Sequence, residues 1–255
     1  MKISLIQTSL TWENPQANRD NFETLINSIK EATDIIILPE MFSTGFTMTP
    51  NAVAETMDGD TVKWMKATAA AKDCAVTGSL VIEENGSYYN RLLFVLPDGE
   101  IKTYDKRHLF SLAGEDKAYT AGADRLIINY RGWKISPFVC YDLRFPVFSR
   151  NTEDIDLMLY VANWPAPRVA AWDALLKARA IENMCYVAGV NRTGQDNNGH
   201  SYLGHSQVLD ELGTNVVQPK ENEGVFTVEL NKESLLETRN KFQFLNDRDS
   251  FSLLR

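Results

Sequence analysis

The sequence has few cysteines and no long apolar run. Its 255 residues include three cysteines, Cys74, Cys140 and Cys185, and no basic and then apolar stretch follows Met1. An odd and sparse set of cysteines argues against a disulfide framework, so we expect a protein of the reducing cytoplasm. No apolar run approaches the ~20 residues that a membrane helix needs, which argues against a membrane protein.

Positive charge is also scarce. The 26 Lys and Arg residues against 34 Asp and Glu give a formal net charge of −8. This balance argues against a nucleic-acid surface, because phosphate binding depends on clustered Lys and Arg. The sequence also lacks a phosphate loop, a Gly-x-Gly-x-x-Gly motif and a paired-cysteine zinc pattern. With 44% hydrophobic residues it has an ordinary globular composition, so we expect a folded protein with a small-molecule ligand or a protein partner.

Short apolar segments alternate with amphipathic ones along the whole chain. Apolar spacing predicts helices after Asn14-Pro15, from near Asp60, from Val169 to Ala180 and from Asn231 to Arg239. Predicted strands are Lys2–Ser9, Asp34–Leu38, Cys74–Ile82, Tyr88–Leu96, Ile101–Tyr104, Leu126–Tyr130, Trp133–Val139, Leu157–Ala162, Tyr186–Val190, Ser206–Leu209 and Val225–Leu230. Because hairpins are mixed with strand-helix units, the pattern favours two sheets with helices outside, in a single domain over residues 1–255.

Three segments place a reactive side chain just past an apolar strand, where the chain can face a ligand. The side chains are Glu40, Lys106 and Cys140. Each alone has a structural explanation, as a solvated acid, a surface base and a small core residue. The segments are Leu38–Phe42, Tyr104–Phe110 and Phe138–Pro146.

Together these three side chains can carry out nucleophilic catalysis. A nearby ammonium favours ionisation of a thiol, and Lys106 would supply it for Cys140. Glu40 would act as the general base, first for the thiol and then for water. Lys106 and the backbone N–H of Tyr141 would stabilise an oxyanion. Such a site needs no histidine, metal ion or organic cofactor.

The three segments resemble the signatures of the nitrilase, or carbon–nitrogen hydrolase, superfamily, whose catalytic Glu, Lys and Cys follow one another in this order. The resemblance extends over nearly the whole chain. It implies an α/β fold, a four-layer αββα sandwich, that associates into a homodimer or a larger homo-oligomer. Further matching positions are Gln7, Gly78-Ser79, Arg179–Asn183 and Asn191-Arg192.

The resemblance also implies a second glutamate that orients the catalytic lysine and the substrate. Glu115 is the matching residue, and its neighbour Asp116 is the competing one. We prefer Glu115.

Within the superfamily, Pro39–Phe46 and Cys140–Pro146 are most similar to the ω-amidase branch. Members of that branch hydrolyse 2-oxoglutaramate and 2-oxosuccinamate. The resemblance therefore implies an amidohydrolase that takes a small linear carboxamide and water, forms an acyl-thioester on Cys140 and releases ammonia. Arg144 and Arg168 are candidates for binding a substrate carboxylate, although for Arg144 we favour pairing with an acid such as Asp142, which would hold the turn together. Candidate walls of the pocket are Phe42, Phe110, Tyr141 and Trp164.

Other functions use the same residues. The Glu-Lys-Cys set would also serve an N-carbamoyl amino acid hydrolase or a nitrilase. A Cys–His hydrolase would instead pair Cys140 with His108, His200 or His205. His200 and His205 are spaced for a shared metal, although polar loop residues explain them better. A non-catalytic binding protein would have the fold with no chemistry at all. Cys74 and Cys185 open apolar strands, and we interpret both as packing residues.

Overall fold

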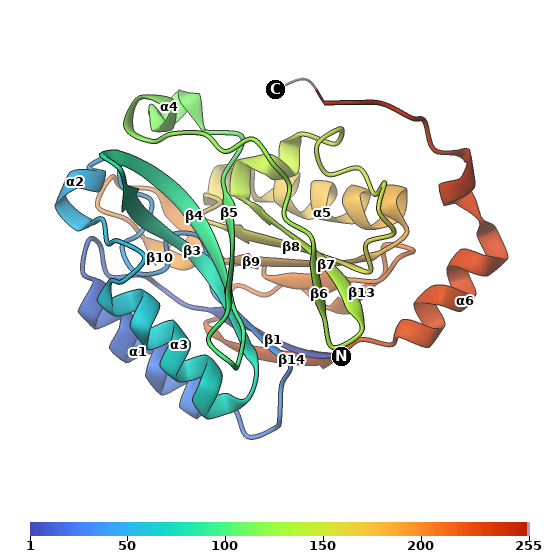
Figure 1. Cartoon of the computed structure of the whole chain (residues 1–255), viewed down its shortest axis with the longest axis horizontal. Helices are drawn as coiled ribbons and strands as arrows, with labels where there is room; N and C mark the ends of the chain where they lie inside the picture. Colours follow the sequence, from blue (N-terminus) through green and yellow to red (C-terminus); the bar gives the residue numbers. More distant parts are fainter. Residues whose placement is uncertain (254–255) are drawn as a thin grey trace.

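Two sheets lie face to face in the computed structural model, which describes residues 1–253 (Figure 1). The first sheet has the strand order β14-β1-β2-β3-β4-β5. Strands β1, β2 and β3 are parallel, whereas β14 and β4 run antiparallel to their neighbours. The bounds are β1 Lys2–Gln7, β2 Ile35–Ile37, β3 Ala75–Glu84, β4 Ser87–Val95, β5 Ile101–Asp105 and β14 Gly224–Glu229.

The second sheet has the order β13-β12-β9-β8-β7-β6, in which β7, β8 and β9 are parallel. A small hairpin of β10 and β11 follows β9. The bounds are β6 Ile128–Tyr130, β7 Trp133–Val139, β8 Leu157–Ala162, β9 Tyr186–Asn191, β10 Thr193–Gln195, β11 Ser201–Leu203, β12 Gln207–Leu209 and β13 Asn215–Val217.

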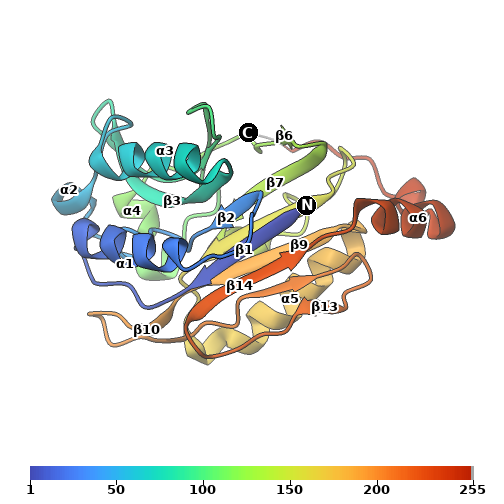
Figure 2. The same cartoon turned by 90° about the horizontal axis from the view of Figure 1, so that it is seen from below.

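Helices cover the outer faces of both sheets. Figure 2 shows α1 and α3 on the side of the first sheet and α5 on the opposite side, next to the second. Helix α1 begins where the sequence predicts, because the Asn14 side chain accepts a hydrogen bond from the Ala17 N–H at 3.1 Å. The bounds are α1 Pro15–Asn27, α2 Pro50–Val53, α3 Asp60–Lys72, α4 Glu115–Ala118, α5 Val169–Asn183 and α6 Lys232–Phe242.

Apolar side chains fill the spaces between these layers. Phe22 of α1 and Met65 of α3 pack on the outward side of the first sheet with Ile36. On its other side, Ile37 of the first sheet and Phe138 of the second belong to one continuous core. This layering confirms the predicted αββα sandwich.

The short strands β10, β11 and β13 lie in segments where no strand was predicted. Each has three residues and is partly exposed, so it is too short for a readable alternation of apolar and polar side chains. Their pairing comes from contacts made by the rest of the fold.

The strand directions bring several strand ends to one edge. Strand β4 is antiparallel to both β3 and β5, so β5 runs parallel to β3. Because β3 is parallel to β2, β5 is parallel to β2 as well. The carboxyl ends of β2 and β5 therefore lie on the same edge of the first sheet, and those of β7 and β8 share an edge of the second. Residues that directly follow these four strands form the site described next.

Candidate active site

Lys106 follows β5 and is the centre of a buried cluster of charges. Its Nζ lies 2.8 Å from Oε1 of Glu40 and 2.9 Å from each carboxylate oxygen of Glu115. All three side chains are fully buried. The structure thus brings together three of the residues proposed from sequence, whereas Asp116, the alternative to Glu115, is exposed.

Asn90, in the middle of β4, completes this cluster. Its Nδ2 donates to Oε1 of Glu40 at 2.8 Å and to Oε1 of Glu115 at 3.1 Å. Its main-chain oxygen accepts the Lys106 N–H at 3.0 Å. Sequence reasoning missed this residue, although an asparagine beside a long apolar run was a usable signal. A buried polar side chain in a strand needs partners, and here the partners are the two carboxylates.

Asn163, directly after β8, joins the two sheets at the site. Its N–H donates to Oε2 of Glu40 at 2.8 Å, and its Nδ2 donates to the Glu40 carbonyl at 2.6 Å. The Glu40 carboxylate is therefore held on one oxygen by Lys106 and on the other by the opposite sheet. Asn163 was also missed, because nothing local in the sequence pairs it with a residue more than a hundred positions away.

Cys140 occupies a tight turn directly after β7. Its φ is +44°, in the left-handed region, and it begins a 3-10 turn that ends at Arg144. The thiol interacts with the Glu40 carboxylate and lies 3.9 Å from the Asn163 carbonyl oxygen. A side-chain-bearing residue in this backbone conformation is strained, and such strain is found at functional sites. The turn presents the sulfur to the cluster from the second sheet.

The charges around Cys140 correct one expectation. Burial raises the pKa of its thiol well above the usual range, Glu40 raises it further, and Lys106 offsets only part of this. The lysine is already matched by two carboxylates. Burial acts to lower the pKa of Lys106, but Glu115 and Glu40 together raise it. Cys140 therefore rests as a thiol, and not as the thiolate that an isolated ammonium would favour.

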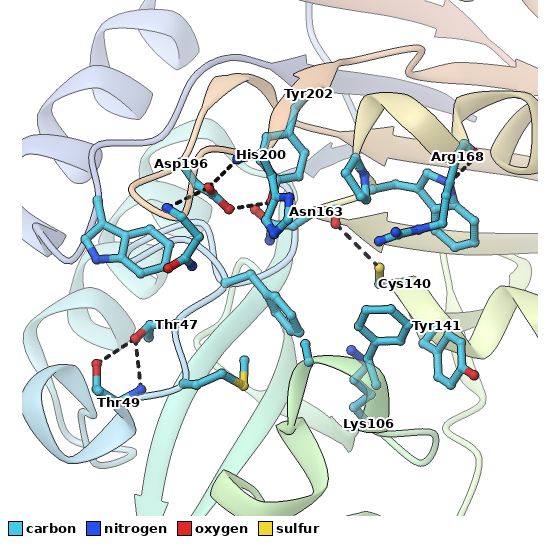
Figure 3. A pocket seen from close by; sticks show the side chains of 18 of the residues that line it. Thr47, Thr49, Lys106, Cys140, Tyr141, Asn163, Arg168, Asp196, His200 and Tyr202 are labelled. Atoms are coloured by element: carbon cyan, nitrogen blue, oxygen red, sulfur yellow. Dashed lines mark hydrogen bonds between the residues drawn. The ribbon is translucent and has the colours of Figure 1, made fainter.

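Cys140 opens into a pocket of about 570 Å³ (Figure 3). This volume falls within the range of ~300–1,000 Å³ that is usual for small-molecule sites. Lys106 and Tyr141 border the pocket on the same side as the sulfur, and Asp196 and His200 lie farther away. Its aromatic lining consists of Trp12, Phe46, Phe110, Tyr141, Trp164 and Tyr202.

Two arginines line the pocket. The guanidinium of Arg144 lies 4.9 Å from the centre of the Trp164 ring, and that of Arg168 lies 5.3 Å from the Phe110 ring. Within residues 1–253, neither guanidinium has a carboxylate partner. The alternative pairing of Arg144 with Asp142 is not found, because Asp142 accepts its hydrogen bonds from other residues.

Phe42 does not wall the pocket, which corrects another expectation. Its ring is fully buried in the core outside the first sheet, 5.4 Å from the Phe22 ring and 6.0 Å from the Trp64 ring. The chain turns sharply at Met41, where φ is +42°, and this turn directs the two neighbouring side chains to different places. Glu40 points to the cluster and Phe42 to the core.

Two of the three histidines and the other cysteines have structural surroundings, whereas His200 lines the far part of the pocket. His108 contacts Asp142 and His205 contacts Asp173, each through Nδ1. In the part of the chain that the structure describes, no group of three or more His, Cys, Asp or Glu side chains is placed to hold a metal ion. The two remaining cysteines, Cys74 and Cys185, are fully buried in the apolar cores, and burial raises the pKa of both thiols.

Comparison with known proteins shows which family has this fold. The sequence pattern of the carbon-nitrogen hydrolase family matches residues 2–240. The chain belongs to this family. The superfamily predicted from the three motifs is thereby confirmed.

Several members of the carbon-nitrogen hydrolase family are similar over their full length. Omega-amidase YafV of Yersinia enterocolitica is 47% identical, with 100% of this chain and 99% of the relative covered. 2-Oxoglutaramate amidase of Bacillus subtilis is 32% identical over 96% of each chain. A crystal structure of XC1258 from Xanthomonas campestris, a CN-hydrolase superfamily protein with an arsenic adduct in its active site, is 46% identical. It superposes with a TM-score of 0.97 over 99% of this chain and 98% of that one.

Among the described residues of this carbon-nitrogen hydrolase, no helix has both the length and the apolar character needed to cross a membrane.

Proposed function

We propose that this carbon-nitrogen hydrolase is an ω-amidase, which cleaves the terminal carboxamide of 2-oxoglutaramate or 2-oxosuccinamate and releases ammonia. The observation that carries the proposal is a pocket with a thiol beside a carboxylate and with two unpaired arginines in its lining. A thiol and a base suit acyl transfer from an amide, and unpaired guanidinium groups suit an anionic substrate. The names of the relatives with 47% and 32% identity support the same activity.

The reaction begins with transfer of the Cys140 proton to Glu40. The sulfur attacks the amide carbonyl carbon, a C–S bond forms, and negative charge moves to the carbonyl oxygen. Lys106 and the N–H of Tyr141 stabilise that oxyanion. Glu40 returns its proton to the amide nitrogen, the C–N bond breaks, and ammonia leaves an acyl-thioester. Glu40 then takes a proton from water, which hydrolyses the thioester to the free acid and restores the thiol.

The charged cluster suits these reaction steps because the total charge of the cluster and the bound substrate does not change. At rest, Glu40 and Glu115 are negatively charged and Lys106 is positively charged. In the tetrahedral intermediate Glu40 is neutral, and the oxyanion carries the charge that Glu40 has lost. The negative charge only moves from one neighbour of Lys106 to another, so a preorganised site needs little rearrangement. Glu115 holds the lysine in place throughout, through contacts at 2.9 Å with both of its oxygens.

Substrate charge provides the first test. We expect kcat/KM for ammonia release to be highest with 2-oxoglutaramate, compared with glutamine, N-carbamoyl amino acids and simple nitriles. We expect Arg144→Met and Arg168→Met to raise KM for 2-oxoglutaramate by about 10- to 100-fold, the value of a lost charged hydrogen bond. Hydrolysis of butyramide, which has no carboxylate, should be unchanged in both variants.

Arg248→Met is the control, because Arg248 pairs with Asp154 away from the pocket. A higher kcat/KM with N-carbamoyl amino acids or nitriles would reassign the substrate class. Equal losses with 2-oxoglutaramate and butyramide would contradict carboxylate binding by the two arginines. If none of these compounds releases ammonia, a non-catalytic binding protein describes the chain better than an amidase does.

We propose that the protein forms a homodimer or a larger homo-oligomer. Figure 1 shows the chain after α6 curving back along the outside of the molecule, and we name residues 243–253 the C-terminal arm. The arm and the end of α6 expose 39% to 56% of Phe242, Phe244, Phe251 and Leu253. The Phe242 and Phe244 rings stack with 5.2 Å between their centres, and contiguous exposed apolar groups mark sites of protein association. Light scattering should give a dimer or a larger species, and truncation after Gln243 should weaken it. A monomeric full-length protein at micromolar concentration would contradict the proposal.

We also propose that the protein works in the cytoplasm. The mechanism requires Cys140 as a free thiol, and a reducing compartment keeps exposed thiols in that state.

A further inference from the structure

The candidate active site is divided between the two sheets. Glu40, Lys106 and Glu115 belong to the half built on the first sheet, whereas Cys140 follows a strand of the second. The distance between the lysine and the sulfur therefore depends on contacts that cross from one sheet to the other. Asn163 makes one such contact with Glu40.

Asp142 makes the second crossing contact. It lies two residues after Cys140, and its side chain is fully buried. Its Oδ2 accepts hydrogen bonds from the Tyr104 hydroxyl at 2.7 Å and from the Val139 N–H at 2.9 Å. Its Oδ1 contacts the His108 N–H at 3.1 Å and His108 Nδ1 at 2.7 Å. One carboxylate thus bridges the turn that carries the nucleophile and the segment that carries the lysine.

The partners of Asp142 flank Lys106 on both sides. Tyr104 lies two residues before the lysine, and His108 lies two residues after it. The Tyr104 oxygen also accepts the Arg107 N–H at 3.2 Å, which fixes the backbone immediately after the lysine. Contacts on both sides restrict the lysine segment more than one contact would.

The proton positions in this network follow from its chemistry. Burial raises the pKa of Tyr104 well above its usual range, and Asp142 raises it further, so the hydroxyl stays protonated and donates. A carboxylate can only accept, so His108 Nδ1 carries the proton toward Asp142. The His108 ring stacks on Phe145, with 3.8 Å between ring centres, and Phe145 directly follows the nucleophile turn. Four donors converge on Asp142, as a buried carboxylate requires.

We propose that Asp142 is a positioning residue, which acts through His108 and Tyr104 to hold Cys140 of the second sheet at its working distance from Lys106 of the first. It does not touch the reacting atoms. The inference rests on the proposed function only for the substrate used in the assay, because the arrangement serves any amide that Cys140 attacks. This role explains why His108 lies beside the site without being a base in the mechanism.

The test separates positioning from stability. We expect His108→Phe, which keeps the stacking on Phe145, to lower kcat by about tenfold, and Asp142→Asn to lower it by about a hundredfold, with KM within about twofold. Alkylation of Cys140 by iodoacetamide, with no amide substrate present, should slow in both variants, because the sulfur moves away from Lys106, whose ammonium favours ionisation of the thiol.

The control is the second His–Asp pair of the chain. His205 Nδ1 lies 2.9 Å from Asp173, and the His205 side chain is 19% exposed, the same as that of His108. That pair joins α5 to the segment just before β12 and does not connect the two halves of the site. We expect His205→Phe to lower the melting temperature about as much as His108→Phe while kcat stays within about twofold of wild type.

Several results would overturn the inference. If His108→Phe lowers kcat no more than His205→Phe does, Asp142 and His108 serve stability alone. The same conclusion follows if KM rises and kcat is unchanged. Should Asp142→Asn fail to fold, His108→Phe and Tyr104→Phe decide the question. Slower alkylation in these variants supports positioning even if 2-oxoglutaramate is not the substrate, so a wrong substrate and a wrong positioning role give different results.

Discussion

Replacement of Glu40 by glutamine is expected to lower kcat by about three orders of magnitude, within the range for loss of a general base. Glutamine cannot take the proton from Cys140, and the raised pKa of that thiol means that little thiolate forms without a base. It also cannot activate the water that hydrolyses the acyl-thioester. Ammonia release in the steady state and the intact mass of the enzyme during turnover measure both steps.

The same variant should keep its fold. Removing the Glu40 charge leaves Lys106 paired with Glu115 at 2.9 Å, so no buried charge loses its only partner. We therefore expect the melting temperature to change little, which separates loss of chemistry from loss of structure. Glu211→Gln is a suitable control, because Glu211 is buried but lies outside the site. A Glu40→Gln enzyme with kcat within tenfold of wild type would show that another group acts as the base.

Replacement of Lys106 by methionine is expected to abolish turnover and to destabilise the protein by about 3–5 kcal/mol, the usual cost of removing one partner from a buried ion pair. Without the ammonium, Glu40 and Glu115 remain buried together with only Asn90 and backbone groups as donors. The oxyanion also loses its cation. Urea unfolding measures the stability, and ammonia release measures the activity.

A double variant tests whether the unbalanced charge of the two carboxylates explains this loss of stability. Lys106→Met with Glu115→Gln removes one of the two unmatched carboxylates, so we expect it to recover part of the lost stability and none of the activity. Glu115→Gln alone keeps the Lys106 to Glu40 contact at 2.8 Å and should have nearly wild-type stability. If the double variant is no more stable than Lys106→Met, packing and not charge explains the loss.

Much of the fold could be predicted because local patterns dictate it. The apolar spacing around Phe22 and Ile26 predicts α1, and the β-branched run Ile35–Ile37 predicts a strand buried on both faces. The three-residue strands β10, β11 and β13 could not be predicted, because their pairing depends on a surface that only the folded sheets provide.

The sequence by itself determined which reactive groups follow the strands of this protein, because a polar side chain directly after an apolar run is a local signal. Glu40, Lys106 and Cys140 were found in this way. Only the tertiary structure decided how they act on one another, since distances across two sheets have no local signature. It showed that Asn90 and Asn163 hold Glu40, and that Lys106 is matched by two carboxylates. Cys140 therefore keeps its proton, because burial and the nearby Glu40 raise the pKa of its thiol, and Lys106 offsets only part of this increase.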